Sequence, residues 1–302
     1  MNNIFLYNSE KRTANIVQKR PFVKRFWRLF LISNKFRRGT AEKNVFLQNK
    51  TKIVMRHLSA LLSLLVLLSA CNSKGSKGNL NITMSHSANE KELVFDTMTY
   101  SNEFGNQFTV TEIQYFISNI ELCDSKGSWT PFNSEKHIFY IDTDIEESQT
   151  LKSSELKTGQ YTKIRFTFGM NESDNVTGHF TDAPEANMFW PEPLGGGYHY
   201  MKLNGRWIDD NGQLSPMNVH LGIGQNSSLT EFYHNHFQVE LPVNVNIVED
   251  GEAKIQLNMV IDNWFRTPNI IDLAEYGSGI MQSQEAQALY KANGNDVFKI
   301  LP

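Results

Sequence analysis

Two short segments of the sequence place an imidazole and a thioether two residues apart. His86 follows Met84, and His199 precedes Met201. Side chains at this spacing on a β-strand point to the same face of a sheet, so each pair could serve one ligand. Imidazole and thioether groups together favour copper, particularly Cu(I), over magnesium or calcium. Later segments add two more histidines, so the candidate metal ligands are His86, His199, Met201, His220 and His236.

The histidine set has competing interpretations, because the sequence lacks H-E-x-x-H, C-x-x-C and G-x-S-x-G motifs. A single inward histidine is commonly a hydrogen-bonded core residue, and methionine commonly fills a core. A second hypothesis is a metal-free binding module with an aromatic ligand face made of Trp129, Trp190, Tyr198, Tyr200 and Trp207. A third is a zinc hydrolase with Glu192 or Glu240 as base. We expect a metal-binding protein that is not an enzyme, with zinc as the alternative to copper.

The elements that must position these side chains are predicted to be strands. Alternation of apolar and polar residues begins at Leu80 and recurs between turn-forming segments such as Asp209-Asp210-Asn211-Gly212. The predicted strands are 80–86, 92–100, 108–110, 113–122, 137–141, 161–168, 198–203, 218–224, 235–248 and 253–260. His236 is preferred to His234 as a ligand because it begins one of them. Short strands at this spacing predict an all-β fold, an antiparallel β-sandwich or barrel-like domain.

Only the C-terminal part of the chain has a helical pattern. Ser283 can cap a short helix over residues 284–292, and Asn293-Gly294 should end it. Cys123 is the sole cysteine after Cys71, which excludes a disulfide within that part of the chain. We interpret Cys123 as a free structural thiol.

The segment before Cys71 has the layout of an export signal. Met55 and Arg56 precede an apolar run from Leu58 to Leu68, which is too short for a membrane-spanning helix. Leu68-Ser69-Ala70-Cys71 resembles a bacterial lipobox, in which the cysteine is acylated. We therefore predict an upstream extension over 1–54, a lipoprotein signal over 55–70, a flexible tether over 71–79 and one β domain over 80–302.

The charge distribution supports this division. Residues 1–70 contain 14 of the 29 Lys and Arg residues and two of the 32 acidic residues. From Cys71 onward, 15 basic and 30 acidic residues remain. An acidic domain argues against nucleic acid as a partner, because Lys and Arg contacts to phosphate supply most of such affinity. We expect membrane lipid to be the partner, through acylated Cys71, at the outer membrane of the cell envelope and facing the periplasm.

Several segments in order resemble the MbnP-like family, which is related to copper-binding proteins of methanotrophs. Trp190 lies in one of them and is followed by three consecutive glycines. The resembling segments are the strand ending near His86, Tyr100–Asn106, Ile113–Leu122, Met188–Trp190 with the Gly-Tyr strand, His220–Gly222, Asp262–Phe265 and Asn293–Phe298. The sequence departs from the family at Pro191-Glu192-Pro193, where many members have a second tryptophan, and it lacks the paired cysteines of one branch.

The resemblance implies a β-sandwich-like extracytoplasmic protein that binds copper through histidines, here as a lipoprotein of Bacteroidetes type. In some members of the family a tryptophan also contributes, after a di-haem peroxidase-like partner protein has oxidised it to kynurenine. Trp190 is the position most similar to that tryptophan. The resemblance therefore makes Trp190 a candidate modified residue and a di-haem protein a candidate partner.

Overall fold

The computed structural model describes residues 75–98, 100–226, 228 and 230–302. The predicted extension, the signal segment and residues 71–74 of the predicted tether, including Cys71, lie outside these residues. The first strand begins at Lys77, three residues before the predicted start at Leu80. Among the described residues, no helix has the length and apolar character needed to cross a membrane.

The first sheet is built around β1 (Lys77–Ala88). Its inward side chains Leu80, Ile82 and Met84 are almost fully buried, which confirms the predicted alternation. β1 pairs in parallel with β15, in register from Asn79 opposite Glu252 to Ser87 opposite Val260. The other members of this sheet are β2 (Lys91–Glu92), β7 (Thr150–Lys152), β8 (Leu156–Lys157), β15 (Glu252–Val260) and β16 (Phe298–Leu301).

The second sheet contains β4 (Gln107–Asp124), a single strand where the sequence predicted two. The order of its main strands is β11-β10-β4-β9-β14, and all the pairings described for it are antiparallel. Its strands besides β4 are β3 (Tyr100–Ser101), β5 (Trp129–Pro131), β6 (Ile138–Asp142), β9 (Gly159–Phe168), β10 (Met201–Ile208), β11 (Leu214–Leu221) and β14 (Phe237–Ile247). β12 (Ile223–Gln225) and β13 (Phe232–His234) form a separate hairpin.

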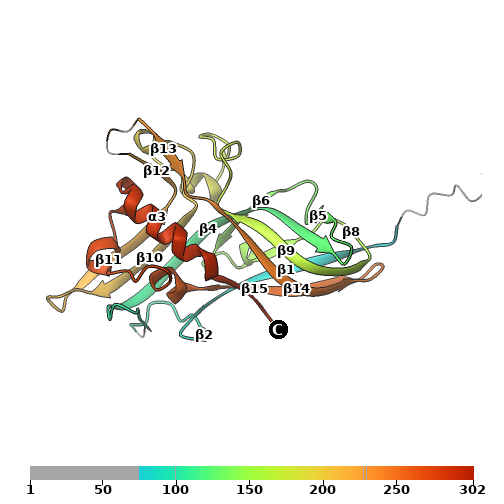
Figure 1. Cartoon of the computed structure of the whole chain (residues 1–302), viewed down its shortest axis with the longest axis horizontal. Helices are drawn as coiled ribbons and strands as arrows, with labels where there is room; N and C mark the ends of the chain where they lie inside the picture. The colour runs from blue at the N-terminus through green and yellow to red at the C-terminus, as the bar shows by residue number, and fades with distance from the viewer. Residues whose placement is uncertain (1–74, 99, 227, 229) are drawn as a thin grey trace, which may run out of the picture. The chain divides into compact units, whose positions relative to one another are not determined.

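The helix predicted near the C-terminus is confirmed as α3 (Gln284–Asn293). The Ser283 hydroxyl accepts a hydrogen bond from the backbone N–H of Ala286, and Gly294 follows the last turn. Figure 1 shows α3 near β12, and Gln287 of α3 donates to the carbonyl oxygen of His220 on β11 at 2.8 Å. The other helical segments are α2 (Leu273–Tyr276) and the 3-10 turns η1 (Glu146–Gln149), η2 (Glu185–Met188), η3 (Glu192–Leu194), η4 (Ile261–Phe265), η5 (Ile280–Gln282) and η6 (Gly294–Asp296).

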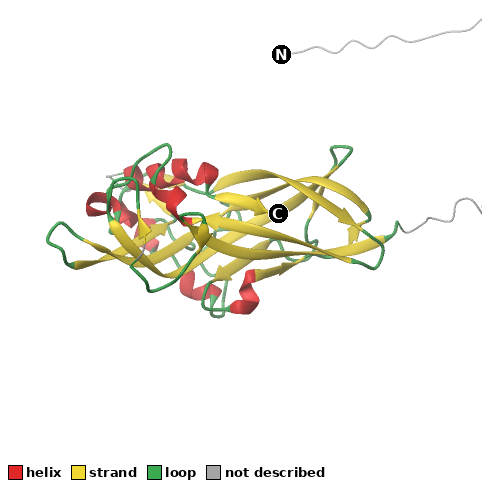
Figure 2. Cartoon of the chain, turned by 90° about the horizontal axis from the view of Figure 1, so that it is seen from below, coloured by secondary structure: helices red, strands yellow, loops and turns green. Residues whose placement is uncertain are grey.

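The two sheets enclose one apolar core, which confirms the predicted sandwich (Figure 2). The prediction of a strand over 92–100 was wrong. Val94 is 55% exposed and Asp96 has a φ of 56°, so the residues around them do not form an extended strand. Cys123 is buried and free, as predicted.

Candidate metal centre

His199 lies in an irregular segment just before β10. Its backbone N–H and its Nδ1 both contact the carbonyl oxygen of Met188, at 2.7 and 2.9 Å. A carbonyl oxygen only accepts hydrogen bonds, so Nδ1 carries the ring proton and Nε2 keeps its lone pair. Nε2 is buried and has no hydrogen-bond partner among the described residues. Burial lowers the pKa of His199 to about 3, so the ring is neutral at pH 7.

His220 has its tautomer fixed by a different chain of contacts. Its Nε2 lies 2.9 Å from Oδ1 of Asn204 on the neighbouring strand β10. The amide of Asn204 is oriented because its Nδ2 donates to Oε2 of Glu112, at 3.0 Å. Nε2 of His220 therefore donates, and Nδ1 keeps its lone pair. Burial, and secondly the charge of Lys202, lower the pKa of His220 to about 4.

The two neutral imidazoles are neighbours. Their ring centres lie 5.1 Å apart, with the ring planes nearly perpendicular at 83°. Two imidazoles that bind one ion at about 2.0 Å per nitrogen have ring centres about 5 to 6 Å apart. The residues present therefore fit a two-histidine metal site, with both tautomers held by hydrogen bonds to groups behind the rings.

Trp190 lies against this pair. Its ring centre is 4.6 Å from that of His199, its Nε1 donates to the carbonyl oxygen of Leu194 at 3.0 Å, and it is 1% exposed. Gly222 lies on another side of the indole, because a Cβ built there would be 2.6 Å from Cε3 of Trp190. The backbone between β11 and β12 thus approaches the indole as only glycine permits.

Replacing Gly222 with alanine is expected to lower the free energy of unfolding by about 1–3 kcal/mol, the usual cost of overpacking a core. Urea unfolding measures this change. Gly75→Ala is the control, because a Cβ at Gly75 meets no atom within 4 Å. Equal stability of the Gly222→Ala variant and the parent would contradict the close contact with Trp190.

A glycine run holds the segment that carries His199. Gly195, Gly196 and Gly197 have φ values of 116°, 69° and 76°, which glycine adopts without strain. The loop after β9 supports this run. The Thr177 hydroxyl accepts from the N–H of Gly197, and Oδ1 of Asn175 accepts from the N–H of Tyr198, each at 2.7 Å.

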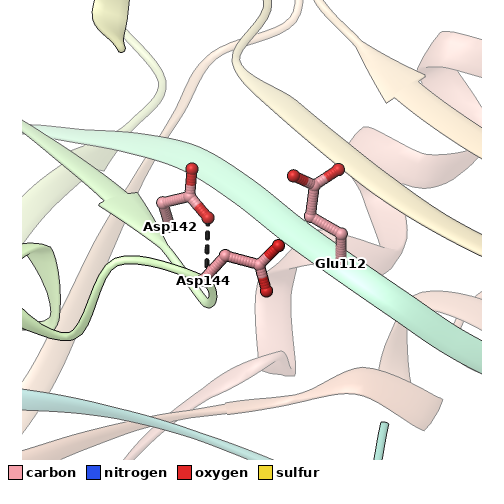
Figure 3. Close-up of side chains that lie close together, drawn as sticks. All are labelled: Glu112, Asp142 and Asp144. Carbon is pink, nitrogen blue, oxygen red and sulfur yellow. Dashed lines mark hydrogen bonds between the residues drawn. The ribbon is translucent and has the colours of Figure 1, made fainter. Parts of the chain in front are cut away.

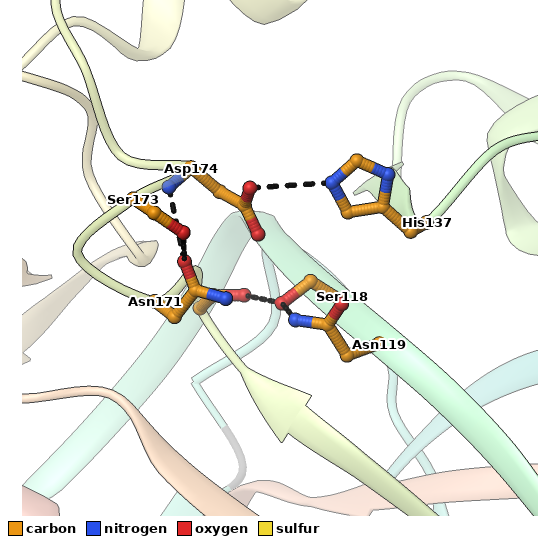
Figure 4. Close-up of polar contacts among 7 residues, drawn as sticks. Ser118, Asn119, His137, Asn171, Ser173 and Asp174 are labelled. Carbon is orange, nitrogen blue, oxygen red and sulfur yellow. Dashed lines mark hydrogen bonds and ion pairs between the residues drawn. The ribbon is translucent and has the colours of Figure 1, made fainter. Parts of the chain in front are cut away.

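The loop itself is fastened to the sheet by the contacts in Figure 4. Asp174 lies 3.3 Å from Nε2 of His137, measured to Oδ1, and its backbone N–H donates to Oδ1 of Asn171. Asn171 also accepts from the hydroxyl of Ser173. These contacts hold the loop against the second sheet. The loop in turn holds the glycine run that precedes His199.

The other predicted ligands lie elsewhere. His86 is buried on β1, where its Nε2 is 3.2 Å from the hydroxyl of Tyr115, and burial lowers its pKa to about 4. His236 lies just before β14, with its ring 6.1 Å from that of Tyr200 and 6.2 Å from that of His234, centre to centre. Within the described part of the chain, no ring contact joins either residue to the pair of His199 and His220.

Met201 does not share a face with His199, so that prediction was wrong. Met201 is fully buried, and its partners on the neighbouring strands are Leu221 and Tyr115. The next residue, Lys202, pairs with His220, whose ring contacts that of His199. Adjacent residues of a strand point to opposite faces. Met201 therefore belongs to the core, and His220 belongs to the outer face of the sheet.

The predicted aromatic ligand face is also wrong. Four of its five rings are at most 6% exposed, namely Trp190, Tyr198, Tyr200 and Trp207. The fifth, Trp129, is covered by the guanidinium of Arg165, whose Cζ is 4.1 Å from the ring centre. In the zinc-hydrolase hypothesis Glu240 was a candidate catalytic base. Its carboxylate forms an exposed ion pair with Lys163 at 2.7 Å.

Sequence reasoning missed a group of three carboxylates on the outer face of the second sheet. Ligand oxygens of Glu112, Asp142 and Asp144 lie within 4.8 Å of one another (Figure 3). Asp142 already accepts hydrogen bonds from Tyr140, Gln114 and the N–H of Asp144. No other group of three His, Cys, Asp or Glu side chains in the described residues is this close. The spacing of Asp142 and Asp144 was visible in the sequence, but the approach of Glu112 depends on strand pairing.

A family model supplies the comparison with known proteins: the MbnP model matches residues 77–282. The chain belongs to the MbnP family. This match confirms the resemblance predicted from the sequence. The solved structure of MbnP from Methylosinus trichosporium is similar, with 12% sequence identity, a TM-score of 0.48, and coverage of 74% of this chain and 98% of that chain. No curated protein matches this chain.

Proposed function

We propose that this member of the MbnP family is an extracytoplasmic copper-binding protein whose ligands are His199 and His220. The observation that carries the proposal is the Nε2 of His199. It is buried, unprotonated and without a hydrogen-bond partner in the described residues, and its ring neighbours that of a second neutral histidine. A buried polar atom in this condition costs free energy unless something binds it.

The donor set suits a transition-metal ion such as copper rather than magnesium or calcium. Two neutral imidazoles suit copper, and the carboxylate, carbonyl and water ligands preferred by magnesium and calcium are not what His199 and His220 provide. Met188 and Asn204 each hold one ring with its lone pair available, which reduces the ordering required on binding. Bound copper would bring a redox-active centre close to the indole of Trp190.

The proposal also includes the location of the protein in the cell envelope and its partner protein. We expect acylation of Cys71 to anchor the domain to the outer membrane on its periplasmic side. We also expect a di-haem peroxidase-like partner to be the candidate oxidant of Trp190. Because Trp190 is 1% exposed, such a partner could not touch the ring and would have to withdraw electrons through intervening residues.

Titration of the purified protein with Cu(I) under reducing conditions, in competition with a coloured chelator, tests the proposal. The expected result is one tightly bound equivalent that is lost when His199 and His220 are both replaced by alanine. Absence of stoichiometric uptake, or uptake that is unchanged in the double variant, would overturn it. Intact mass of the protein from its native membrane would report acyl chains and any oxygen added at Trp190.

The amide of Asn204 should matter although it is not a ligand. Asn204→Ala removes the group that fixes the tautomer of His220, so copper affinity is expected to fall by about 10- to 100-fold. Asn218→Ala is the matched control, because Asn218 lies directly opposite Asn204 on β11. The same chelator competition measures both variants, and equal affinities in the two would contradict the role of Asn204.

A further inference from the structure

A second pair of imidazoles lies apart from His199 and His220. His234 ends β13, and His236 lies between β13 and β14. Their ring centres are 6.2 Å apart, and Nε2 of His234 is 3.7 Å from Oε1 of Glu172. All three side chains line a cleft of about 710 Å³ between the β12–β13 hairpin and α3. The copper site proposed above uses none of them.

We propose that His234, His236 and Glu172 form a separate site for a divalent transition-metal ion such as Zn²⁺. Two ligand atoms bound to one zinc ion at about 2.0–2.2 Å lie about 3.5 Å apart. The 3.7 Å separation of Nε2 and Oε1 is close to this value, and it exceeds the length of an ordinary hydrogen bond. The ligand atoms of all three side chains do not lie within 4.8 Å of one another without an ion, and the His234 and His236 ring centres are 6.2 Å apart, so the site requires the half-buried His236 side chain to move toward His234 when the ion binds.

The hydrogen bonding of His234 permits this role. Its Nδ1 is buried and makes no hydrogen bond among the described residues, so no partner decides which ring nitrogen holds the proton. Nε2 can therefore present its lone pair to an ion that also binds Glu172.

The donor set distinguishes this site from the copper site. Two imidazoles and a carboxylate are a zinc-binding combination, and the cleft leaves further positions open for water. The carboxylate of Glu172 is the difference, because the two ligands proposed for the copper site are both imidazoles. Lys291 opposes a cation, because its Nζ donates to the carbonyl oxygen of His234 and its charge lies near His236.

Calorimetric titration with Zn²⁺ tests the inference, using the protein with His199 and His220 both replaced by alanine so that the copper site cannot contribute. One equivalent of Zn²⁺ should bind. His234→Ala and His236→Ala, added singly to that protein, should each weaken binding at least 10-fold. Lys291→Met should strengthen it several-fold.

The control is His179→Ala, which removes an exposed histidine that does not line the cleft. Circular dichroism shows whether each variant is folded, and Co²⁺ in place of Zn²⁺ gives a visible spectrum that reports nitrogen and oxygen ligands directly. Absence of zinc binding, or binding that survives both His234→Ala and His236→Ala, would overturn this site. Either result would leave the copper proposal standing, because that proposal is tested with the other two histidines.

Discussion

Replacing His199 with alanine is expected to lower Cu(I) affinity by more than about 100-fold, beyond the effect usual for residues that only orient a ligand. His199 contributes the one imidazole nitrogen of the pair that is known to be both buried and without a hydrogen-bond partner in the described residues. The variant also leaves His220 as the one remaining imidazole of the proposed site. A single imidazole does not hold copper against a competing chelator.

Met201→Leu is the decisive control for this experiment. The sequence suggested that Met201 shares the site with His199, whereas the structure buries it on the opposite face. Leucine preserves the volume and apolar character of that core position. Copper affinity should therefore be unchanged in Met201→Leu. A loss in Met201→Leu comparable with that in His199→Ala would mean that the ligand set is wrong.

The difference between these two residues shows where sequence reasoning reaches its limit. Strand phase correctly placed Leu80, Ile82 and Met84 in the core, because β1 alternates without interruption. The same logic failed between His199 and Met201. The N–H of His199 bonds to the carbonyl oxygen of Met188 rather than to a neighbouring strand, so regular pairing begins only at Met201.

Contacts between distant segments explain what the sequence could not predict. The tautomer of His220 depends on Asn204 and Glu112, which come from two other strands. The parallel pairing of β1 with β15 joins strands that are far apart in the sequence and has no local signal. Histidines were recognisable as candidates by type, but which of them meet was decided by register and by loops. His86, for example, has the same spacing to a methionine as His199 and lies with Tyr115 instead.

The buried histidines also predict that the metal-free protein loses stability in mild acid. The pKa of His86 falls from 6.5 to about 4, and that of His199 to about 3, chiefly through burial. Between pH 6.5 and these values the unfolded chain binds more protons than the folded protein. The free energy of unfolding therefore decreases as the pH falls through this window, and the full stability is present only above it.

The expected loss is large. One pKa unit corresponds to about 1.4 kcal/mol, so His86 alone accounts for about 3 kcal/mol and His199 for at least as much. Together they represent much of the roughly 5–15 kcal/mol that stabilises a typical domain. Urea unfolding of the metal-free protein at a series of pH values from about 7 to about 4 measures the loss, and its slope gives the number of protons taken up.

Two variants test the contribution of His86 to this slope. His86→Gln should be less stable at neutral pH, but its stability should fall less steeply because one proton fewer is taken up on unfolding. Tyr115→Phe removes the hydroxyl that contacts Nε2 of His86 and keeps the imidazole, so it should be destabilised with the slope retained. A slope that is the same in His86→Gln as in the parent would show that His86 is not held neutral by its burial between the sheets.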